Sequence, residues 1–520
     1  MTPVSIQACD MPTGDPSHMR SARSLRIAAG DDVAVAVDDL VAGESVRVDG
    51  CDITLPETIA RGHKFALHAL AANTVVHKYG FPIGRTTAAV ARGAWLHTHN
   101  LATQLSAVDV NAAAVAGRAG VPDSVIPAVA GAQTFLGYRR PDGRVGTRNE
   151  IWVLCSVGCV ANTARRIAEL GAARHAGKVD GIHAYTHVFG CSQLGDDLAN
   201  TQRVLAALAT HANVGGVLLV GLGCESLQLR RLLDEVGTTD PNRIRAFNTQ
   251  QVDDEIEAGS KALDELVAVA AQDRRTPCPL ADLVIGLKCG GSDGFSGISA
   301  NPLIGRIADR INGAGGRTIL SEIPEIFGAE HLLMRNAASA EVAGDIGNLV
   351  RRFKQYFVDH GEPVSENPSP GNLAGGITTL EEKSLGAVQK GGAGRVTQVL
   401  RYGERTRAPG LALLEAPGND AVSSTALVAA GATVLLFTTG RGTPLGFPAP
   451  TLKIASNTAL AQGKPRWIDF DAGSVLDGEP LDVAATRLLD LILRTASGET
   501  ARNERNGERQ IALWKTGVTL

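Results

Sequence analysis

Short runs that alternate apolar and polar residues open the chain. Four of them, at 25–28, 33–37, 44–48 and 52–55, are separated by Gly, Asp or Pro. Alternation with a period of two, broken by such residues, is typical of antiparallel strands. The pattern predicts a small antiparallel β domain over residues 25–105.

From residue 137 the pattern changes to strands that alternate with helices. Continuous apolar runs, such as 151–157, 181–188, 217–221 and 281–287, predict buried parallel strands, and stretches with helical spacing lie between them. Such alternation predicts a mostly parallel sheet with helices on both faces. The expected fold class is therefore α/β, preceded by the small β domain.

Composition divides the chain further. Residues 1–24 mix Pro, Ser, Asp and Arg, so we expect a disordered extension there, and the Ala-, Val-, Gly- and Pro-rich residues 106–135 predict a linker. A Pro-, Gly- and Asn-rich segment at 361–376 indicates a boundary. We expect one α/β domain at 136–365, carrying cysteine-containing loops, and a C-terminal α/β domain at 366–520.

Charge and cysteine content exclude several classes of function. The net charge is -4 and no basic run is interleaved with aromatic residues, which argues against a nucleic-acid partner. No apolar stretch reaches the roughly 18 residues that cross a bilayer, so we expect no membrane partner. The N-terminus lacks the apolar segment of a secretory signal. Eight cysteines in 520 residues are too few for a disulfide scaffold, which favours a reducing cytoplasm.

Three cysteines share one local setting. Cys191, Cys224 and Cys289 each lie beside glycine just after a predicted strand. The carboxyl ends of parallel strands meet at the ligand-binding rim of an α/β sheet, so we expect the three to converge there. Three thiolates could bind iron or zinc, hold a cluster with one open iron, or supply a nucleophile. If the ion were Ca²⁺ or Mg²⁺, oxygen ligands would be needed, and the candidates are Asp196, Asp197, Glu225 and Asp293.

Histidines crowd into the end of the β domain. Five of the 12 histidines lie in one block with several cationic side chains: His63, Lys64, His68, His77, Lys78, Arg85, His97 and His99. A group this dense favours an anion or carboxylate site, or a source of a general base.

Glycine-rich turns supply further candidates. The turn after residues 281–287 carries Lys288, Cys289 and Asp293 and leads into a helix, an arrangement that can bind an anion. A second turn, at 438–446, could hold an oxyanion through backbone N–H groups and Arg441.

Several sequence blocks together resemble one family. They are residues 62–100, 137–149 (GYRRPDGRVGTRN), 190–197 (GCSQLGDD), 221–225 (GLGCE), 288–294 (KCGGSDG) and 369–372 (SPGN). The chain resembles the altronate and galactarate dehydratase family of sugar-acid lyases over nearly its whole length after the first two dozen residues. Residues 190–197 and 378–386 look more like the altronate branch.

The resemblance implies both fold and activity. It implies an SAF-like first domain and dehydration of a hexonate, D-altronate to 2-keto-3-deoxy-D-gluconate in the altronate branch. The implied cofactor is iron, as Fe²⁺ or as an iron–sulfur cluster with an open site, with Mn²⁺, Mg²⁺ or Ca²⁺ as alternatives. We expect a small sugar acid as the partner and a homo-oligomer.

Removing a proton next to a carboxylate creates an unstable dianion, so cations or a metal must stabilise it while an acid protonates the departing hydroxyl. The expected metal ligands are Cys191, Cys224 and Cys289. The expected acid, base and carboxylate contacts are His63, Lys64, His97, His99 and Lys288. The expected substrate contacts are Arg148, Asn149, Ser292, Asp293, Asn372 and Arg441.

Three other functions compete with this interpretation. Two are lyases acting on galactarate or on another 2-hydroxy acid such as sulfolactate. The third, from a different class, is a non-catalytic carbohydrate- or anion-binding protein that uses the histidine-rich β domain. The cysteines argue against this last function, because binding alone requires no thiolates.

Overall fold

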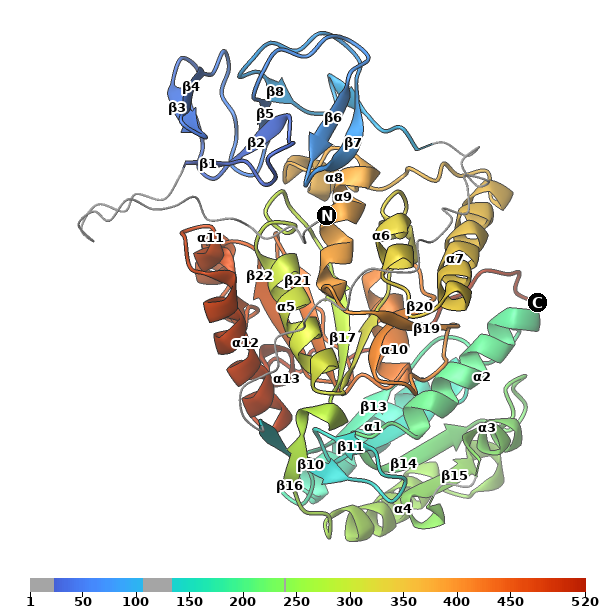
Figure 1. The fold of residues 1–520 in the computed structure, drawn as a ribbon. Helices are drawn as coiled ribbons and strands as arrows, with labels where there is room; N and C mark the ends of the chain where they lie inside the picture. Colours follow the sequence, from blue (N-terminus) through green and yellow to red (C-terminus); the bar gives the residue numbers. More distant parts are fainter. Residues whose placement is uncertain (1–22, 106–132, 238–239) are drawn as a thin grey trace.

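The structure is a computed structural model that describes residues 23–105, 133–237 and 240–520 (Figure 1). Most of the expected N-terminal extension and linker therefore lies outside the described residues. Within the described part, Ser24 and Thr134 already belong to strands. No helix in these ranges is both long enough and apolar enough to cross a membrane.

The N-terminal part is the antiparallel β domain that alternation predicts. One sheet has the order β1-β2-β5-β8, and β3-β4 and β6-β7-β9 form smaller sheets. The strands are β1 (Ser24–Leu25), β2 (Val33–Ala36), β3 (Ser45–Val48), β4 (Cys51–Thr54), β5 (Lys64–Ala66), β6 (Val75–Lys78), β7 (Phe81–Thr86), β8 (Trp95–Leu96) and β9 (Leu101–Ala102). Residues such as Val46, Val48 and Ile53 alternate inward into its core.

A four-stranded parallel sheet follows, in the order β13-β12-β14-β15. Its strands are β12 (Glu150–Cys155), β13 (Gly181–Tyr185), β14 (Val214–Gly221) and β15 (Ile244–Asn248), and its helices are α1 (Ala161–Arg174), α2 (Gly195–Ala209), α3 (Leu229–Val236) and α4 (Glu255–Ala270). A small antiparallel sheet, made of β10 (Thr134–Arg139), β11 (Val145–Gly146) and β16 (Thr276–Pro279), adjoins it.

A second parallel sheet has seven strands in the order β19-β20-β18-β17-β21-β22-β23. They are β17 (Val284–Cys289), β18 (Arg317–Leu320), β19 (Val396–Leu400), β20 (Gly410–Leu414), β21 (Val434–Thr439), β22 (Thr451–Ala455) and β23 (Phe470–Asp471). Its helices are α5 (Ala300–Gly313), α6 (Glu330–Arg335), α7 (Ala340–Asp359), α8 (Pro370–Ala374), α9 (Leu380–Ala387), α10 (Asp420–Ala429), α11 (Thr458–Gly463), α12 (Leu481–Ala496) and α13 (Arg502–Arg505).

The α/β class is confirmed, but the expected boundary near residue 365 does not coincide with a division between sheets. β17 and β18 precede that position and pair with β21 and β20, which follow it. The division between the two parallel sheets falls instead near β16. Strand partners far apart in sequence form because their apolar faces pack into one core, which local composition does not reveal.

The β domain covers α8 and α9 above the seven-stranded sheet (Figure 1). The approach is close: a Cβ added at Gly376 would lie 2.2 Å from the carbonyl oxygen of Gly62, and one added at Gly294 would lie 2.0 Å from the same atom. Only glycine tolerates such contact. The histidine-rich block is thereby held against the glycine-rich turn that follows β17.

Candidate active site

Two lysines of the β domain meet a glutamate of the α/β part. Lys64 on β5 and Lys78 on β6 each place Nζ 2.8 Å from a different carboxylate oxygen of Glu382 on α9. Lys64 also donates to Thr378 Oγ1 at 2.5 Å. The three charged side chains are each 1% exposed. We call these four residues the interdomain cluster.

Burial and the shared carboxylate move the pKa values of this cluster in different directions. Burial lowers the pKa of Lys64 to about 8, and Glu382 offsets only part of that effect. Burial also opposes the charge of Lys78, but there the attraction of Glu382 wins and raises the pKa. Burial alone would raise the pKa of Glu382, yet the two lysines lower it to about 2. Lys64 is therefore the member able to exchange a proton near neutral pH.

Two histidines lie beside the interdomain cluster. His97 Nδ1 is 2.9 Å from Thr378 Oγ1, and the rings of His63 and His97 have centroids 5.1 Å apart. Trp95 Nε1 donates to His63 Nδ1 at 3.1 Å, which makes that nitrogen an acceptor. Burial lowers the pKa of His63, and burial together with the Lys64 charge lowers the pKa of His97 to about 4. Both imidazoles are neutral at neutral pH and can accept protons.

A small cavity adjoins the interdomain cluster. Its volume is about 10 Å³, close to the minimum that holds one water molecule. Its lining joins the β domain, the turn after β17 and α9: Tyr79, Ser292, Asp293, Ser296, Gly297, Asn301, Ile377, Glu382, Lys383, Gly386 and Ala387. Two of the predicted substrate contacts, Ser292 and Asp293, therefore line this cavity.

Asp293 is held by several donors. Its Oδ1 accepts from Ser296 Oγ at 2.9 Å and from Ser456 Oγ at 2.8 Å, and Asn457 Nδ2 lies 3.1 Å from Oδ2. Burial raises its pKa despite these bonds. The predicted contact Asn372 lies nearby, because its Nδ2 donates to the Ser292 carbonyl at 2.8 Å. Three of the predicted substrate contacts, Ser292, Asp293 and Asn372, therefore lie close together beside this cavity.

His99 and Arg441 lie at the surface. His99 is exposed, and its ring centroid is 5.0 Å from that of Trp95. The side chain of Arg441 is exposed too, while its backbone N–H donates to the Gly291 carbonyl at 3.0 Å. Both remain candidates for contact with a substrate that enters from this side.

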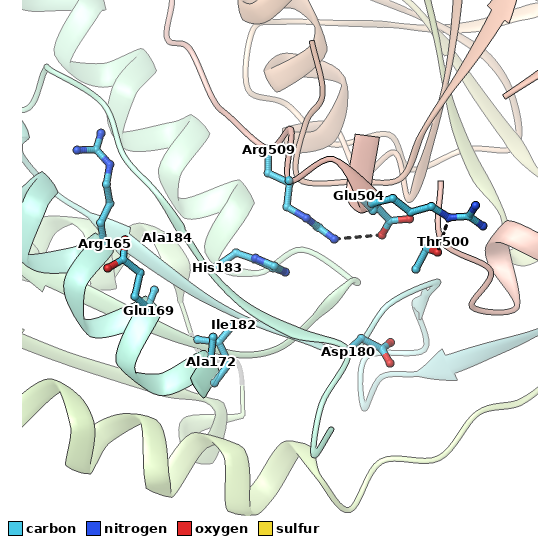
Figure 2. Close-up of a pocket in the computed structure, with 13 residues that line it drawn as sticks. Arg165, Glu169, Ala172, Asp180, Ile182, His183, Ala184, Thr500, Glu504 and Arg509 are labelled. Atoms are coloured by element: carbon cyan, nitrogen blue, oxygen red, sulfur yellow. Dashed lines mark hydrogen bonds and ion pairs between the residues drawn. The ribbon is translucent and has the colours of Figure 1, made fainter. Parts of the chain in front are cut away.

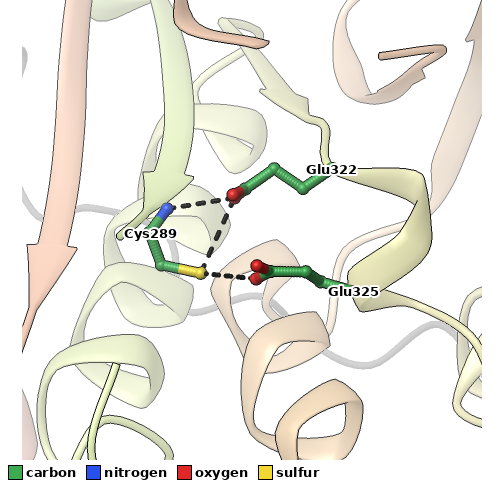
Figure 3. Close-up of side chains that lie close together, drawn as sticks. All are labelled: Cys289, Glu322 and Glu325. Carbon is green, nitrogen blue, oxygen red and sulfur yellow. Dashed lines mark hydrogen bonds between the residues drawn. The ribbon is translucent and has the colours of Figure 1, made fainter. Parts of the chain in front are cut away.

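A second group of charges lies at the carboxyl ends of β17 and β18 (Figure 3). Lys390 Nζ is 2.7 Å from Cys289 Sγ and 3.3 Å from Glu322 Oε2. Cys289 Sγ is 3.1 Å from Glu325 Oε2. Lys288 Nζ donates to Glu322 Oε1. We call Lys288, Cys289, Glu322, Glu325 and Lys390 the buried ion cluster.

Opposite charges compensate each other within this cluster. Burial opposes the Lys288 charge, but Glu322 and Asp420 outweigh it and raise the pKa, so Lys288 remains an ammonium ion. Burial, followed by the nearby glutamates, raises the pKa of Cys289 to about 12. Burial would raise the pKa of Glu325, but Lys383, whose Nζ is 2.9 Å from Glu325 Oε1, leads the lysines that lower it to about 2.

Cys289, Glu322 and Glu325 form a buried group that could hold a metal ion. One ligand atom from each lies within 4.8 Å of the other two. One sulfur and two carboxylate oxygens suit a borderline divalent ion such as Fe²⁺ or Mn²⁺ better than Ca²⁺ or Mg²⁺. The donor set therefore fits the class of metal that the sequence suggests.

The structure corrects the expected convergence of three cysteines. Cys191 and Cys224 follow β13 and β14 in the four-stranded sheet, whereas Cys289 ends β17 in the other sheet. Among the described residues, these three sulfur atoms do not form a group within 4.8 Å of one another. The prediction of one shared rim is wrong, because β17 starts a new sheet instead of extending the first one.

Arg148 and Asn149 lie elsewhere. Arg148 makes two hydrogen bonds to Glu504, at 2.8 and 2.7 Å, and Asn149 accepts from Arg140 Nη1 at 2.9 Å. Both residues stand at the amino end of β12, opposite to the end at which open α/β sheets bind ligands. The structure does not bring them to the site, and their side chains join the scaffold.

The four carboxylates that we expected as ligands if the ion were Ca²⁺ or Mg²⁺ do not lie together either. Glu225 binds the backbone N–H of Gly223 at 2.6 Å, and Asp197 accepts from the backbone N–H groups of Thr516 and Gly517 at 2.8 Å each. Asp196 lies in the first turn of α2. Of the four, Asp293 alone lines the interdomain cavity.

A larger cavity of about 520 Å³ lies between α1, β13 and the C-terminal residues (Figure 2). Its charged groups are largely paired: Arg509 binds Glu150 at 3.0 Å and Glu504 at 3.2 Å. None of the predicted site residues lines it. Size alone therefore does not identify the active site here.

Sequence reasoning missed several charged partners of the candidate residues. Glu322, Glu325, Glu382, Lys383 and Lys390 were not singled out as site residues. One signal was present: every residue of α9 is buried although the helix contains Glu, Glu, Lys and Ser in succession. Charged residues are rarely buried without partners, so a short polar helix without an exposed face points to a buried ion network.

Together, the fold and the site define a three-part α/β protein in which a small β domain caps a buried, ion-rich site. Three family models match consecutive parts of the chain. They are the altronate/galactarate dehydratase SAF domain at 22–104, the D-galactarate dehydratase/altronate hydrolase second domain at 137–271, and the D-galactarate/altronate dehydratase C-terminal domain at 280–519. Their boundaries agree with the division between sheets near β16.

Curated relatives match over nearly the whole chain. An altronate dehydratase of Escherichia coli (strain K12) is 48% identical over 498 residues, which are 95% of this chain and 99% of the relative. An altronate dehydratase of Bacillus subtilis (strain 168) is 44% identical over 95% of this chain and 99% of its own length. A galactarate dehydratase (L-threo-forming) of E. coli K12 is 34% identical over 91% of this chain and 93% of the relative. The chain therefore belongs to the altronate/galactarate dehydratase family.

Proposed function

We propose that this protein is a hydro-lyase that converts D-altronate to 2-keto-3-deoxy-D-gluconate and water. The observation that carries the proposal is its 48% identity to an altronate dehydratase over 95% of the chain. Identity to the galactarate dehydratase is lower, at 34%. The neutral histidines and the lysine with a lowered pKa beside the interdomain cavity supply the acid–base groups that a dehydration requires.

The reaction removes the proton on C2 and expels the hydroxyl on C3. The electron pair of the C2–H bond forms the C2–C3 double bond, and the hydroxyl leaves with a proton as water. The resulting enol takes up a proton at C3 and becomes the 2-keto acid. A base, an acid and stabilisation of the carboxylate are therefore required.

We assign the base to His97 and the acid to Lys64. His97 is neutral, because its pKa is lowered to about 4, and it can accept the C2 proton. Lys64, with a pKa of about 8, is protonated at neutral pH but releases its proton more easily than an ordinary lysine. Both contact Thr378 Oγ1, which can pass a proton between them. His63 orients His97 through ring contact.

Cationic side chains stabilise the dianion that develops on the substrate carboxylate. Lys383 lines the cavity and contacts Glu325, so its ammonium ion is available at the wall of the site. Lys288, the residue before Cys289, remains charged. Its positive charge stabilises negative charge in the site, and it does not act as an acid or base. Ser292, Asn372, His99 and Arg441 are proposed contacts for the hydroxyl groups and carboxylate of the sugar acid.

Iron is the proposed metal, and Cys289, Glu322 and Glu325 would hold it. When bound, the ion supplies Lewis-acid polarisation of a substrate oxygen. The Lys390 ammonium ion now contacts both Cys289 Sγ and Glu322, so it must move aside for the ion. Mn²⁺ is the alternative that this donor set also suits.

Metal content tests that assignment without using activity. Protein purified without oxygen and equilibrated with Fe²⁺ should contain one equivalent at this site, and Glu325→Gln should lose it. Glu330→Gln is a matched control, because Glu330 lies five residues later and instead binds Lys354. Equal iron in wild type and Glu325→Gln would contradict the assignment.

A hexonate does not fit into a cavity of about 10 Å³. Substrate entry therefore requires the β domain and α9 to separate, which breaks the Lys64–Glu382 and Lys78–Glu382 contacts. Closure over the substrate then excludes water and strengthens the remaining electrostatic interactions.

We also propose a homo-oligomer and a cytoplasmic location. Val188, Leu194, Val518 and Leu520 are 84%, 45%, 75% and 80% exposed. The C-terminus lies beside the segment that carries Val188 and Leu194, because Leu520 N donates to the Ser192 carbonyl at 3.0 Å. Such exposed apolar residues suit contact with a second copy of the chain, and sedimentation of the Val188→Asp variant should show dissociation of the oligomer.

The cysteines support the proposed cytoplasmic location. The seven described cysteines are all free thiols, as a reducing compartment favours.

A substrate panel tests the function directly. Protein loaded with Fe²⁺ without oxygen should form a 2-keto acid from D-altronate and water, measured as product carbonyl. Galactarate and sulfolactate should be turned over far more slowly. Preference for either would redirect the substrate assignment, and altronate binding without any turnover would favour the non-catalytic alternative.

A further inference from the structure

Three exposed thiols follow neighbouring strands of the four-stranded sheet. Cys159 comes after β12, Cys191 after β13 and Cys224 after β14, and these strands are adjacent in the order β13-β12-β14. All three cysteines are exposed, whereas Cys289 is buried. Since the strands are parallel, the three loops leave the sheet at the same edge.

The three loops are packed onto one another. Gly158 N donates to the Phe189 carbonyl at 2.9 Å, and Leu227 N donates to the Gly190 carbonyl at 2.9 Å. A glycine precedes each cysteine: Gly158, Gly190 and Gly223. A Cβ at Gly190 would lie 2.0 Å from the Ser156 carbonyl oxygen, and one at Gly158 would lie 2.9 Å from Val188 Cα. These glycines bring the cysteine loops closer than side chains would permit.

Polar groups already point at two of the sulfur atoms. Gln250 Nε2 donates to Cys224 Sγ at 3.6 Å, and Ser192 Oγ donates to Cys191 Sγ at 3.9 Å. Hydrogen bonds to sulfur stabilise thiolates and tune the clusters that they hold. Glu225 orders the Cys224 loop through the backbone N–H groups of Leu222, at 3.1 Å, and Gly223, at 2.6 Å.

A cofactor that joins the three sulfur atoms has to be larger than one metal ion. They do not form a group within 4.8 Å among the described residues, so they do not meet around a single ion. In a four-iron cluster each thiolate binds a different iron and the ligands stand farther apart. With these three cysteines as ligands, one iron of the cluster keeps an open position. We propose that Cys159, Cys191 and Cys224 hold an iron–sulfur cluster.

This site shares no residue with the acid–base site proposed above. The proposed ligands include Cys159 in place of Cys289, which the sequence had suggested. Cys289 instead contacts Glu322 and Glu325. Assembly takes equal amounts of Fe²⁺ and Fe³⁺, together with sulfide, from solution, so no further oxidant is needed. Each thiol loses a proton as its sulfur binds iron. The aliphatic side chains of Val188 and Leu194 flank Cys191 in sequence and would shield a cluster from water once a second copy covers them.

Reconstitution of the full chain with equal amounts of Fe²⁺ and Fe³⁺ and with sulfide, without oxygen, tests the proposal. Wild type should gain broad visible absorbance and acid-labile sulfide, and Cys159→Ser should lose most of both. Cys51→Ser and Cys289→Ser are matched controls that should retain them, since Cys51 is an exposed thiol of the β domain. A Cys159→Ser variant with a full cluster, or a wild type that binds no sulfide, would overturn the proposal.

A second measurement uses only the wild-type protein and so does not depend on how variants fold. Thiol alkylation, located by peptide mass spectrometry, should label Cys159, Cys191 and Cys224 before reconstitution. After reconstitution these three should be protected while Cys51 still reacts. Unprotected Cys159 in the loaded protein would exclude it as a ligand. Dehydration of altronate is measured in a separate assay. A negative result for the cluster therefore does not decide the proposed dehydration, and a negative result for the dehydration does not decide the cluster.

Discussion

Lys64 and Lys78 show how one buried carboxylate leaves two lysines with different proton affinities. Each is 2.8 Å from Glu382, yet burial lowers the pKa of Lys64 to about 8 and the pKa of Lys78 is raised. The first can exchange a proton near neutral pH, while the second maintains positive charge in the cluster. A lysine with a lowered pKa in a closed site is typical of acid–base catalysis.

The pH dependence of kcat/KM follows from these values. In the proposed mechanism, activity requires neutral His97 and protonated Lys64. The rate should therefore rise as the pH increases through about 4 and fall as it increases above about 8. Initial rates of 2-keto acid formation across this range measure both limbs. If Lys64→Arg stays active, its falling limb should move to higher pH. A flat profile up to pH 10 would contradict the role of Lys64.

Removing the carboxylate between the two lysines should destabilise the fold. Glu382→Gln leaves two buried ammonium groups without their anion, and loss of one partner of a buried pair costs about 3–5 kcal/mol. Urea denaturation at pH 7 measures the change in free energy of unfolding. Glu499→Gln is the control: it pairs with Arg494 at the surface and should cost less than about 1 kcal/mol. Equal losses in both variants would refute the interdomain ion network.

At the level of elements, the glycine-rich turns decide how closely the loops pack. Gly190 and Gly177 both have positive φ, 98° and 76°. An added Cβ would collide with Ser156 at the first position and meet nothing within 4 Å at the second. Gly177→Ala should therefore cost about 1 kcal/mol from backbone strain, and Gly190→Ala about 1–3 kcal/mol more from the collision. Thermal unfolding of both variants checks this order, and equal values would contradict it.

The sequence predicted elements better than their arrangement. The period-two runs became the antiparallel β domain, and the βα alternation became two parallel sheets. The position of β17 could not be predicted, because a buried strand has the same apolar sequence pattern whether it extends one sheet or begins another. The local pattern therefore predicts that Cys289 lies with Cys191 and Cys224. The same Gly-Cys pattern occurs at Cys159, whose loop follows β12 at the same sheet edge as the loops of Cys191 and Cys224.

Only part of the candidate site could be predicted from the sequence. His63, Lys64, His97, Lys288 and Asp293 were recognisable from clustering and from glycine-rich turns. Their acidic partners were not, because Glu322, Glu325 and Glu382 reach them only through tertiary packing. Local sequence shows which side chains can do chemistry, and the fold shows which charges they face.

On the scale of the whole molecule, the proposed function depends on contact between distant parts of the chain. The β domain contributes His63, Lys64 and His97, while the α/β part contributes Thr378 and Glu382. Neither part alone contains both the proton-exchanging groups and their anion. The central claim is that the reaction takes place where these parts meet.

Turnover of D-altronate by single variants tests that claim most directly. His97→Asn and Lys64→Gln should each lower kcat/KM about 100-fold or more, as expected for loss of a general base or acid. His68→Asn, an exposed histidine of the same domain that binds Asp32, should stay close to wild type. If His97→Asn and Lys64→Gln, folded and loaded with iron, keep wild-type turnover, the reaction does not take place at this contact.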